Sequence, residues 1–262
     1  MKKHLFLISA LLLLALTQSK ASVIIKNGLT HLHHLNNSGT QKGFILIANT
    51  GEKKQRVKLY FNDLSIECSG AINYTEPADN YGSLFPFINV DNSDITLEAH
   101  EEYKIIYEID LSKGDVENRS LWSLIMVEVE EPIAIDKKTP GFEIGTKIRY
   151  AIQVVANVGK NTVNGLKFTD IKLGKDENQK RVIKITLKND GEFLVYPKME
   201  LQVFDENGNE AKKVDISPRN VYPKNCQSLN IDLSDLALGN YKAVLFAEFE
   251  DDAIGVNLDL AL

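Results

Sequence analysis

Three histidines near the start of the chain form its only histidine cluster. His31, His33 and His34 lie within the segment Thr-His-Leu-His-His, and imidazoles at this spacing can share a metal ion. Neither a cysteine nor an acidic residue stands beside them in the sequence to complete a coordination shell. We therefore interpret the cluster as part of a solvated loop or an edge strand, and we expect no metal site and no cofactor.

Acidic residues gather near the end of the chain, where oxygen ligands for Ca²⁺ would be available. Glu248, Glu250, Asp251 and Asp252 lack the alternating acid and glycine pattern of a dedicated calcium loop, so a charged hairpin turn is the favoured interpretation. A second group of carboxylates would in principle suit glycosidase chemistry, but on strand edges and turns such groups more often face solvent and guard against aggregation. This second group comprises Glu101, Glu102, Glu128, Glu130 and Glu131.

Motifs of other catalytic classes are missing from the sequence. It contains neither a Gly-x-Ser-x-Gly elbow nor a His-Glu-x-x-His pair, and it has no glycine loop of the kind that cradles phosphates. Neither cysteine is set near a histidine in the sequence. We expect a protein that is not an enzyme and that has no catalytic residues.

The composition is that of an ordinary globular protein. The chain has 262 residues, of which 44% are hydrophobic and 25% charged, enough for one or two domains with their own cores. Its 30 basic and 36 acidic residues give a net charge of −6, so no basic field is available to attract phosphate backbones. We expect no nucleic-acid partner.

The first residues have the pattern of a secretory signal peptide. Lys2 and Lys3 give a basic start, residues 5–16 form an apolar run, and Ser19-Lys20-Ala21 places small residues where a signal peptidase cuts. The apolar run is too short to span a bilayer comfortably, and no cysteine follows the cleavage site. We expect a signal peptide at 1–21, no integral membrane segment after cleavage, and a periplasmic or extracellular protein.

The two cysteines would enter an oxidising compartment. Cys68 and Cys226 are far apart in the sequence and fall in different predicted domains. A disulfide between them would staple the domains, but only cysteines whose Cα atoms come close together can be bridged. We favour two small buried thiols, and the sequence leaves the pairing open.

Hydrophobic periodicity predicts an all-β protein. Short runs rich in Val, Ile, Leu and aromatic residues alternate with polar residues, as half-buried strands do, and turn clusters rich in Asn, Asp and Gly separate them. After the signal peptide no long 3.6-residue pattern is present. The predicted strands cover residues 44–48, 56–61, 103–109, 121–129, 148–158, 182–187, 199–204 and 241–249.

One domain boundary is visible in the pattern. Residues 159–165 form a polar linker bracketed by glycines, and the pieces on either side, 22–158 and 166–262, each suit one sandwich. A weak internal echo supports two related domains, because FILIANTG at 44–51 and VIKITLKNDG at 182–191 both run an alternating strand into Asn and a Gly turn. The expected fold class is all-β, with two tandem immunoglobulin-like β-sandwich domains after a cleaved signal peptide.

Strand and turn patterns in both pieces resemble a known family. Residues 40–158 are similar to the N-terminal immunoglobulin-like domain of pilus-chaperone-type proteins, and residues 166–262 are similar to the second domain of the same broad group, which includes surface proteins that bind WxL proteins. The resemblance implies a periplasmic, non-catalytic protein that binds other envelope or pilus-type proteins. The segments that carry it are Asn49, Ser83–Ile88, Ile95–Glu98, Trp122–Val129, Gly145–Tyr150, Leu187–Gly191, Val203–Gly208, Val221–Pro223 and Leu236–Ala243.

Binding by strand addition fits such a protein, since sheet edges with unpaired N–H and C=O groups capture another chain without catalytic residues. The favoured function is a chaperone-like protein that holds pilus or surface-protein subunits, and the alternative is a structural or adhesive envelope component. An alternating apolar row is the candidate contact, although the same row is more typical of a domain's own core. Two cations on its opposite face would pair with a partner's terminal carboxylate. The candidate residues are Ile148, Tyr150, Ile152 and Val154, with the cations Lys147 and Arg149.

Overall fold

The computed structural model of the chain describes residues 23–78, 80–130, 147–161 and 165–262. Regular structure in these residues is almost entirely β, with two short 3₁₀ turns, η1 (Phe85–Phe87) and η2 (Leu111–Lys113). In this part of the chain, no helix has the length and apolar character needed to cross a membrane. The predicted signal peptide, Glu131, Gly145 and Thr146 lie outside the described residues.

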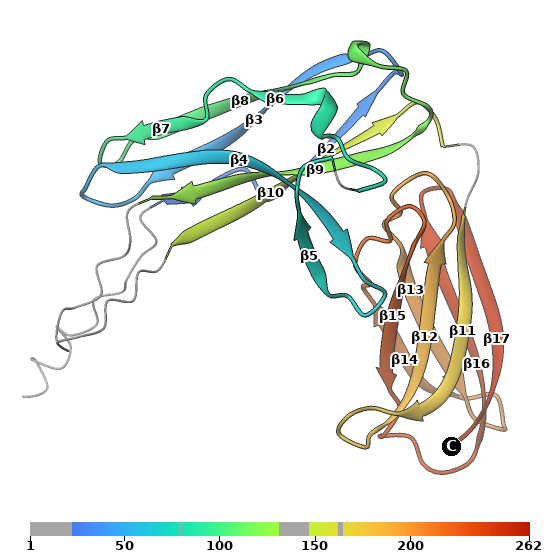
Figure 1. Ribbon diagram of the computed structural model, residues 1–262. Helices are drawn as coiled ribbons and strands as arrows, with labels where there is room; N and C mark the ends of the chain where they lie inside the picture. Colours follow the sequence, from blue (N-terminus) through green and yellow to red (C-terminus); the bar gives the residue numbers. More distant parts are fainter. Residues whose placement is uncertain (1–22, 79, 131–146, 162–164) are drawn as a thin grey trace, which may run out of the picture.

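The first half of the chain forms a sandwich of two sheets (Figure 1). Both sheets are mainly antiparallel, with one parallel strand pair between β2 (Thr30–Leu35) and β10 (Ile148–Val158). In spatial order, the first sheet contains β1 (Val23–Ile25), β3 (Thr40–Asn49), β8 (Glu102–Asp110) and β6 (Ile88–Val90). The second contains β2 (Thr30–Leu35), β10 (Ile148–Val158), β9 (Arg119–Val129), β4 (Gln55–Ile66) and β5 (Ile72–Thr75), and β7 (Asp94–Leu97) also pairs with β4.

The second half forms another sandwich, which is antiparallel throughout its described strand pairs. Strand β10 ends at Val158 and β11 begins at Leu166, on either side of the predicted linker, while the domain boundaries themselves stay a prediction. One sheet contains β11 (Leu166–Lys175), β12 (Arg181–Asn189) and β15 (Asn225–Asp232). The other contains β14 (Glu210–Ile216), β13 (Lys198–Phe204), β16 (Asn240–Phe249) and β17 (Asp252–Ala261).

Each sandwich has its own hydrophobic core, built by the period-2 alternation of its strands. In β8, Ile105, Tyr107 and Ile109 point inward while the residues between them are half-buried. In β12, Ile183, Ile185 and Leu187 do the same for the second core. Because successive side chains of a strand point to opposite faces, this alternation gives each sheet one core face.

A third apolar cluster joins the two sandwiches. Trp122 of β9 and Val155 of β10 lie on the outer face of their sheet and pack with Leu194 and Tyr222 from the second half. The rings of Trp122 and Tyr222 meet edge to face with centroids 4.9 Å apart. Trp122 is therefore buried between the two sandwiches.

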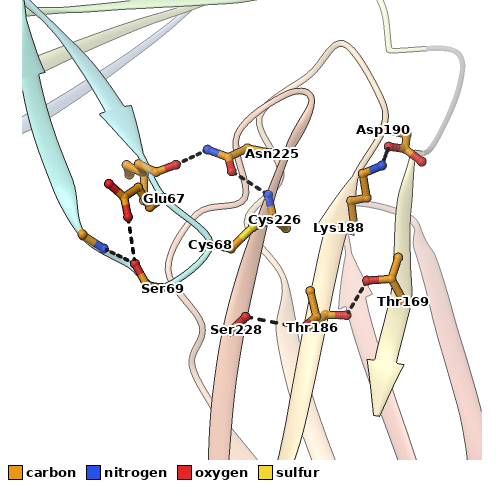
Figure 2. The surroundings of a disulfide bond; sticks show 12 residues. Glu67, Cys68, Ser69, Thr169, Thr186, Lys188, Asp190, Asn225, Cys226 and Ser228 are labelled. Carbon is orange, nitrogen blue, oxygen red and sulfur yellow. Dashed lines mark hydrogen bonds and ion pairs between the residues drawn. A yellow bond between two sulfur atoms is a disulfide. The ribbon is translucent and has the colours of Figure 1, made fainter.

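A disulfide between Cys68 and Cys226 also joins the sandwiches (Figure 2). The Cα atoms are 4.8 Å apart, within the range that a disulfide requires. The preference for two separate thiols was therefore wrong. The two cysteines are 158 positions apart in the sequence, but β4 extends beyond its sandwich and brings Cys68 close to Cys226 in space.

Candidate functional site

Strand β10 is paired along its whole length on one side and along only half of it on the other. Strand β9 pairs with residues 148–158, whereas β2 pairs in parallel with 153–158 alone. Among the residues that the structure describes, none pairs with 148–152 on the β2 side. We call this stretch the open edge.

The main chain of the open edge points its hydrogen-bonding groups outward at alternate residues. The Gln153 N–H lies on the β2 side, because it donates to the Leu29 carbonyl at 2.8 Å. Since these groups alternate along a strand, Arg149 and Ala151 direct their N–H and C=O groups to the same side, beyond the end of β2. These are the groups that an added strand would use.

The predicted row of apolar side chains lies on the core side of the strand. Ile152 and Val154 are fully buried in the first core, and Ile148 and Tyr150 are half-buried against it. The Tyr150 hydroxyl donates to the Val23 carbonyl at 2.6 Å, and burial raises the pKa of this phenol. A partner at the open edge would therefore meet the backbone of this strand rather than its apolar row, and the role of the row in binding stays a prediction.

Lys147 and Arg149 lie on the outer face and already bind a carboxylate. Lys147 Nζ is 2.6 Å from Glu128 Oε1, and Arg149 Nε is 2.5 Å from Glu128 Oε2. The Glu128 side chain is only 8% exposed, and the hydrogen bonds from Lys147 and Arg149 hold the pKa of its carboxyl below the usual range. The expectation that Glu128 faces solvent was wrong, because the cross-strand pairing of β9 and β10 covers it with two long cations.

The second sandwich lies against the end of the open edge. The Gln153 side-chain amide donates to the Tyr222 hydroxyl, and Tyr222 is buried against Trp122. Burial raises the pKa of Tyr222, so its hydroxyl stays protonated. Sequence reasoning missed this contact, because no local pattern links two residues from different sandwiches.

Exposed apolar side chains flank the open edge on β2 and just before it. Leu29 is 50% exposed and Leu32 is 44% exposed. Leu32 is the register partner of Val155, and the Leu29 carbonyl is the acceptor for Gln153. An added strand would therefore find apolar surface beside unpaired main-chain groups.

The histidine cluster lies on β2 and contacts the core. His31 Nδ1 and His33 Nε2 are each 2.8 Å from the hydroxyl of Tyr107, whereas His34 is exposed. Burial lowers the pKa of both His31 and His33. The segment is an edge strand, one of the two predicted possibilities, and the structure directs two of its three imidazoles inward. Among the described residues, no group of three or more His, Cys, Asp or Glu side chains is placed to hold a metal ion.

The charged turn near the end of the chain lies between β16, which ends at Phe249, and β17, which begins at Asp252. The two strands pair in register up to Phe249 and Asp252. Glu250 and Asp251 therefore form a hairpin turn, as the sequence favours, with Glu248 at the end of β16 and Asp252 at the start of β17.

Comparisons with known proteins give structural matches alone. No family model matches the sequence, and no curated protein does. The YadV chaperone has 12% identity and a TM-score of 0.50, with 92% of this chain and all of that chain covered. The class 5 fimbriae chaperone CfaA has 12% identity and a TM-score of 0.48, covering 90% of this chain and 98% of that one. A chain of the Salmonella enterica SafA pilin complex with the SafB chaperone has 11% identity and a TM-score of 0.49, covering 94% and 99%.

The likeness to the YadV chaperone extends over both sandwiches, since it covers nearly the whole of each chain. At 12% identity it speaks for the fold and not for the activity. The predicted fold class is confirmed: the chain consists of two tandem immunoglobulin-like β-sandwiches and has the fold of the YadV chaperone.

Proposed function

We propose that the protein is a periplasmic chaperone-like protein that holds pilus-type or surface-protein subunits by strand addition at the open edge. The observation that carries this proposal is the edge itself, where Arg149 and Ala151 present main-chain groups beyond the end of β2. An extended segment of a subunit would pair with these groups and continue the sheet. Such binding needs no catalytic residue.

Three further observations support the same function. The fold is that of the YadV chaperone. The open edge also adjoins the contact between the two sandwiches, at Gln153 and Tyr222, so a bound subunit would touch both halves of the molecule. The signal-peptide pattern at 1–21 supports export of the protein, which the proposal requires.

Substitution of Ala151 tests the open edge directly. Ala151→Pro removes an N–H that points outward. The hydrogen bonds between β9 and β10 remain, since the residues on either side of Ala151 donate them. The matched control is Ala151→Val, which keeps the N–H. We expect the proline variant to lose at least tenfold in affinity for a co-expressed pilin-type subunit, while the valine variant binds as the parent does.

Amide hydrogen exchange then locates the contact. In the free protein we expect the amides of Arg149 and Ala151 to exchange quickly, and in the complex we expect both to be protected. Protection confined to other strands, or equal binding by the two variants, would refute strand addition at this edge. A structural or adhesive component would instead be favoured if the protein co-fractionated stably with the envelope and did not release its partner to a competing strand.

A further inference from the structure

Strand β4 continues beyond the first sandwich as part of a two-stranded ribbon. Its residues 57–62 pair with β9 inside the sheet, whereas residues 63–66 pair with 72–75 of β5. We call residues 63–75 the ribbon. Figure 1 shows the ribbon leaving the first sandwich and ending beside the second.

The tip of the ribbon is fixed to the second sandwich by one covalent bond and three hydrogen bonds. Cys68 forms the disulfide with Cys226, and the Cys68 carbonyl accepts from the Ser228 N–H at 2.7 Å. Arg219 donates to the Gly70 carbonyl at 2.8 Å, and the Asn225 side chain donates to the Ile66 carbonyl. Figure 2 shows Cys68 at the turn of the ribbon facing Cys226 on β15.

A separate set of contacts joins the sandwiches near the chain connection. The Ser120 N–H donates to the Glu192 carbonyl at 2.9 Å, and the Leu194 N–H donates to Ser120 Oγ at 2.8 Å. In Figure 1 the ribbon reaches the second sandwich at the edge that contains β15. The cluster of Trp122 and Tyr222 lies in the contact between the sandwiches.

Two attachments on different sides of a contact restrict rotation far more than one. Without the ribbon, the sandwiches would be held by the contacts around Ser120 and by the apolar cluster alone, and a single contact of this kind allows one domain to turn against the other. The hydrogen bond from Arg219 to Gly70 is exposed to solvent, where water competes for both groups. The disulfide is a covalent attachment on the ribbon side, which water cannot replace.

We propose that the Cys68–Cys226 disulfide is a redox-controlled clamp that sets the angle between the two sandwiches. On oxidation the two thiols give up two protons and two electrons to the disulfide of a dithiol oxidoreductase, which becomes a dithiol as the S–S bond forms. On reduction by the dithiol form of such an oxidoreductase, the S–S bond breaks, each sulfur takes up one electron and one proton, and the ribbon tip is released. The clamp thus closes after the chain enters an oxidising compartment.

The clamp has a consequence for the open edge, and this consequence rests on the proposed function. Tyr222 of the second sandwich contacts Gln153 at the end of that edge. A fixed angle therefore holds the surface around Tyr222 at a constant distance from Arg149 and Ala151. The reduced protein would present the two surfaces independently.

Distance measurements between the sandwiches test the clamp without any partner, so their outcome does not depend on the proposed function. Lys53 and Leu238 are exposed and lie in different sandwiches. Each would be replaced by a genetically encoded non-natural residue that carries a spin label. We expect one narrow distance distribution in the oxidised protein. We expect a distribution at least twice as broad after reduction with a phosphine, and in Cys68→Ser/Cys226→Ser.

Two controls make the result decisive. Amide exchange in β8 and β12 reports whether each core stays folded, and reduced parent protein replaces the serine variant if that variant fails to fold. Arg219→Ala/Asn225→Ala keeps the disulfide and loses two hydrogen bonds of the tip, and we expect its distribution to stay narrow. Equal widths in the oxidised and reduced proteins with both cores folded would overturn the proposal, as would broadening in this control.

Discussion

Each sandwich contains the same kind of corner, built around a buried asparagine. In the first, the Asn49 amide donates to the carbonyls of Lys53 and Glu98, each at 2.8 Å, and its oxygen accepts from the Gly51 N–H. In the second, the Asn189 amide donates to the carbonyls of Phe193 and Val221 at 2.7 and 2.9 Å, and its oxygen accepts from the Gly191 N–H. The echo between FILIANTG and VIKITLKNDG is therefore the same structural device used twice.

The sandwiches differ in what surrounds that corner. The first one carries the open edge of β10, the ribbon that reaches its neighbour, and two imidazoles turned toward its core. In the second, Asn189 is completely buried and its carbonyl partners lie among buried groups, whereas the bonds of Asn49 are partly open to water. The corner is thus common to both sandwiches, whereas additions to the first sandwich supply the candidate function.

The corner asparagines give the largest expected effect. Asn189→Ala leaves the buried Phe193 carbonyl without its donor, while the Val221 carbonyl keeps the Val195 N–H. We expect a loss of about 2 kcal/mol in the free energy of unfolding, since one such buried group costs about 1–3 kcal/mol. Asn49→Ala would cost about half as much, because water reaches its partners. Urea unfolding of both variants, with the exposed Asn209→Ala as control, measures the difference. Equal losses would show that the two corners are equally closed to water.

A smaller effect is expected from pH, which changes the stability of the first sandwich more than that of the second. Burial lowers the pKa of His31 and His33 below 6.5 in the folded protein, and the neighbouring charges of His31 and His34 act on the pKa of His33 in the same direction. The unfolded chain therefore takes up protons first, and the first sandwich loses stability as the pH falls from 7 through 6.5. Residues 166–262 contain no histidine, so the second sandwich stays level down to about pH 5.

Amide exchange followed by mass spectrometry reads the two sandwiches separately at each pH. His31→Asn/His33→Asn removes both titrating groups, together with their contact to Tyr107. We expect the stability of the first sandwich in this variant to be the same at pH 7 and at pH 5. A loss of equal size in the second sandwich would contradict the assignment to these histidines.

The smallest effect concerns the cations beside the open edge. Glu128→Gln frees Lys147 and Arg149 from their internal carboxylate, and we expect little change in stability because both cations remain half exposed. If the two cations anchor a subunit's carboxylate, this variant binds the subunit more tightly and with a steeper salt dependence. Lys147→Ala/Arg149→Ala then binds more weakly. Unchanged binding in both variants would remove the anchoring role.

Strands with one buried face could be predicted from the sequence. The eight predicted segments all lie in strands of the structure, from 44–48 in β3 to 241–249 in β16, because alternation of apolar and polar residues follows from one face packing on a core. Edge strands escaped the prediction. Strands β11 and β14 bury few side chains, so their sequences lack the contrast on which alternation depends.

By itself, the sequence determined the all-β fold, the two tandem sandwiches and the repeated Asn and Gly corner, since each depends on residues close together in the chain. Only the tertiary structure decided that Cys68 meets Cys226, that Glu128 is buried under two cations, and that β2 stops short of residues 148–152. These features depend on which strands become neighbours and where their pairing ends. Local periodicity carries no information about such long-range choices, because it specifies which face of a strand is buried and not what covers its edge.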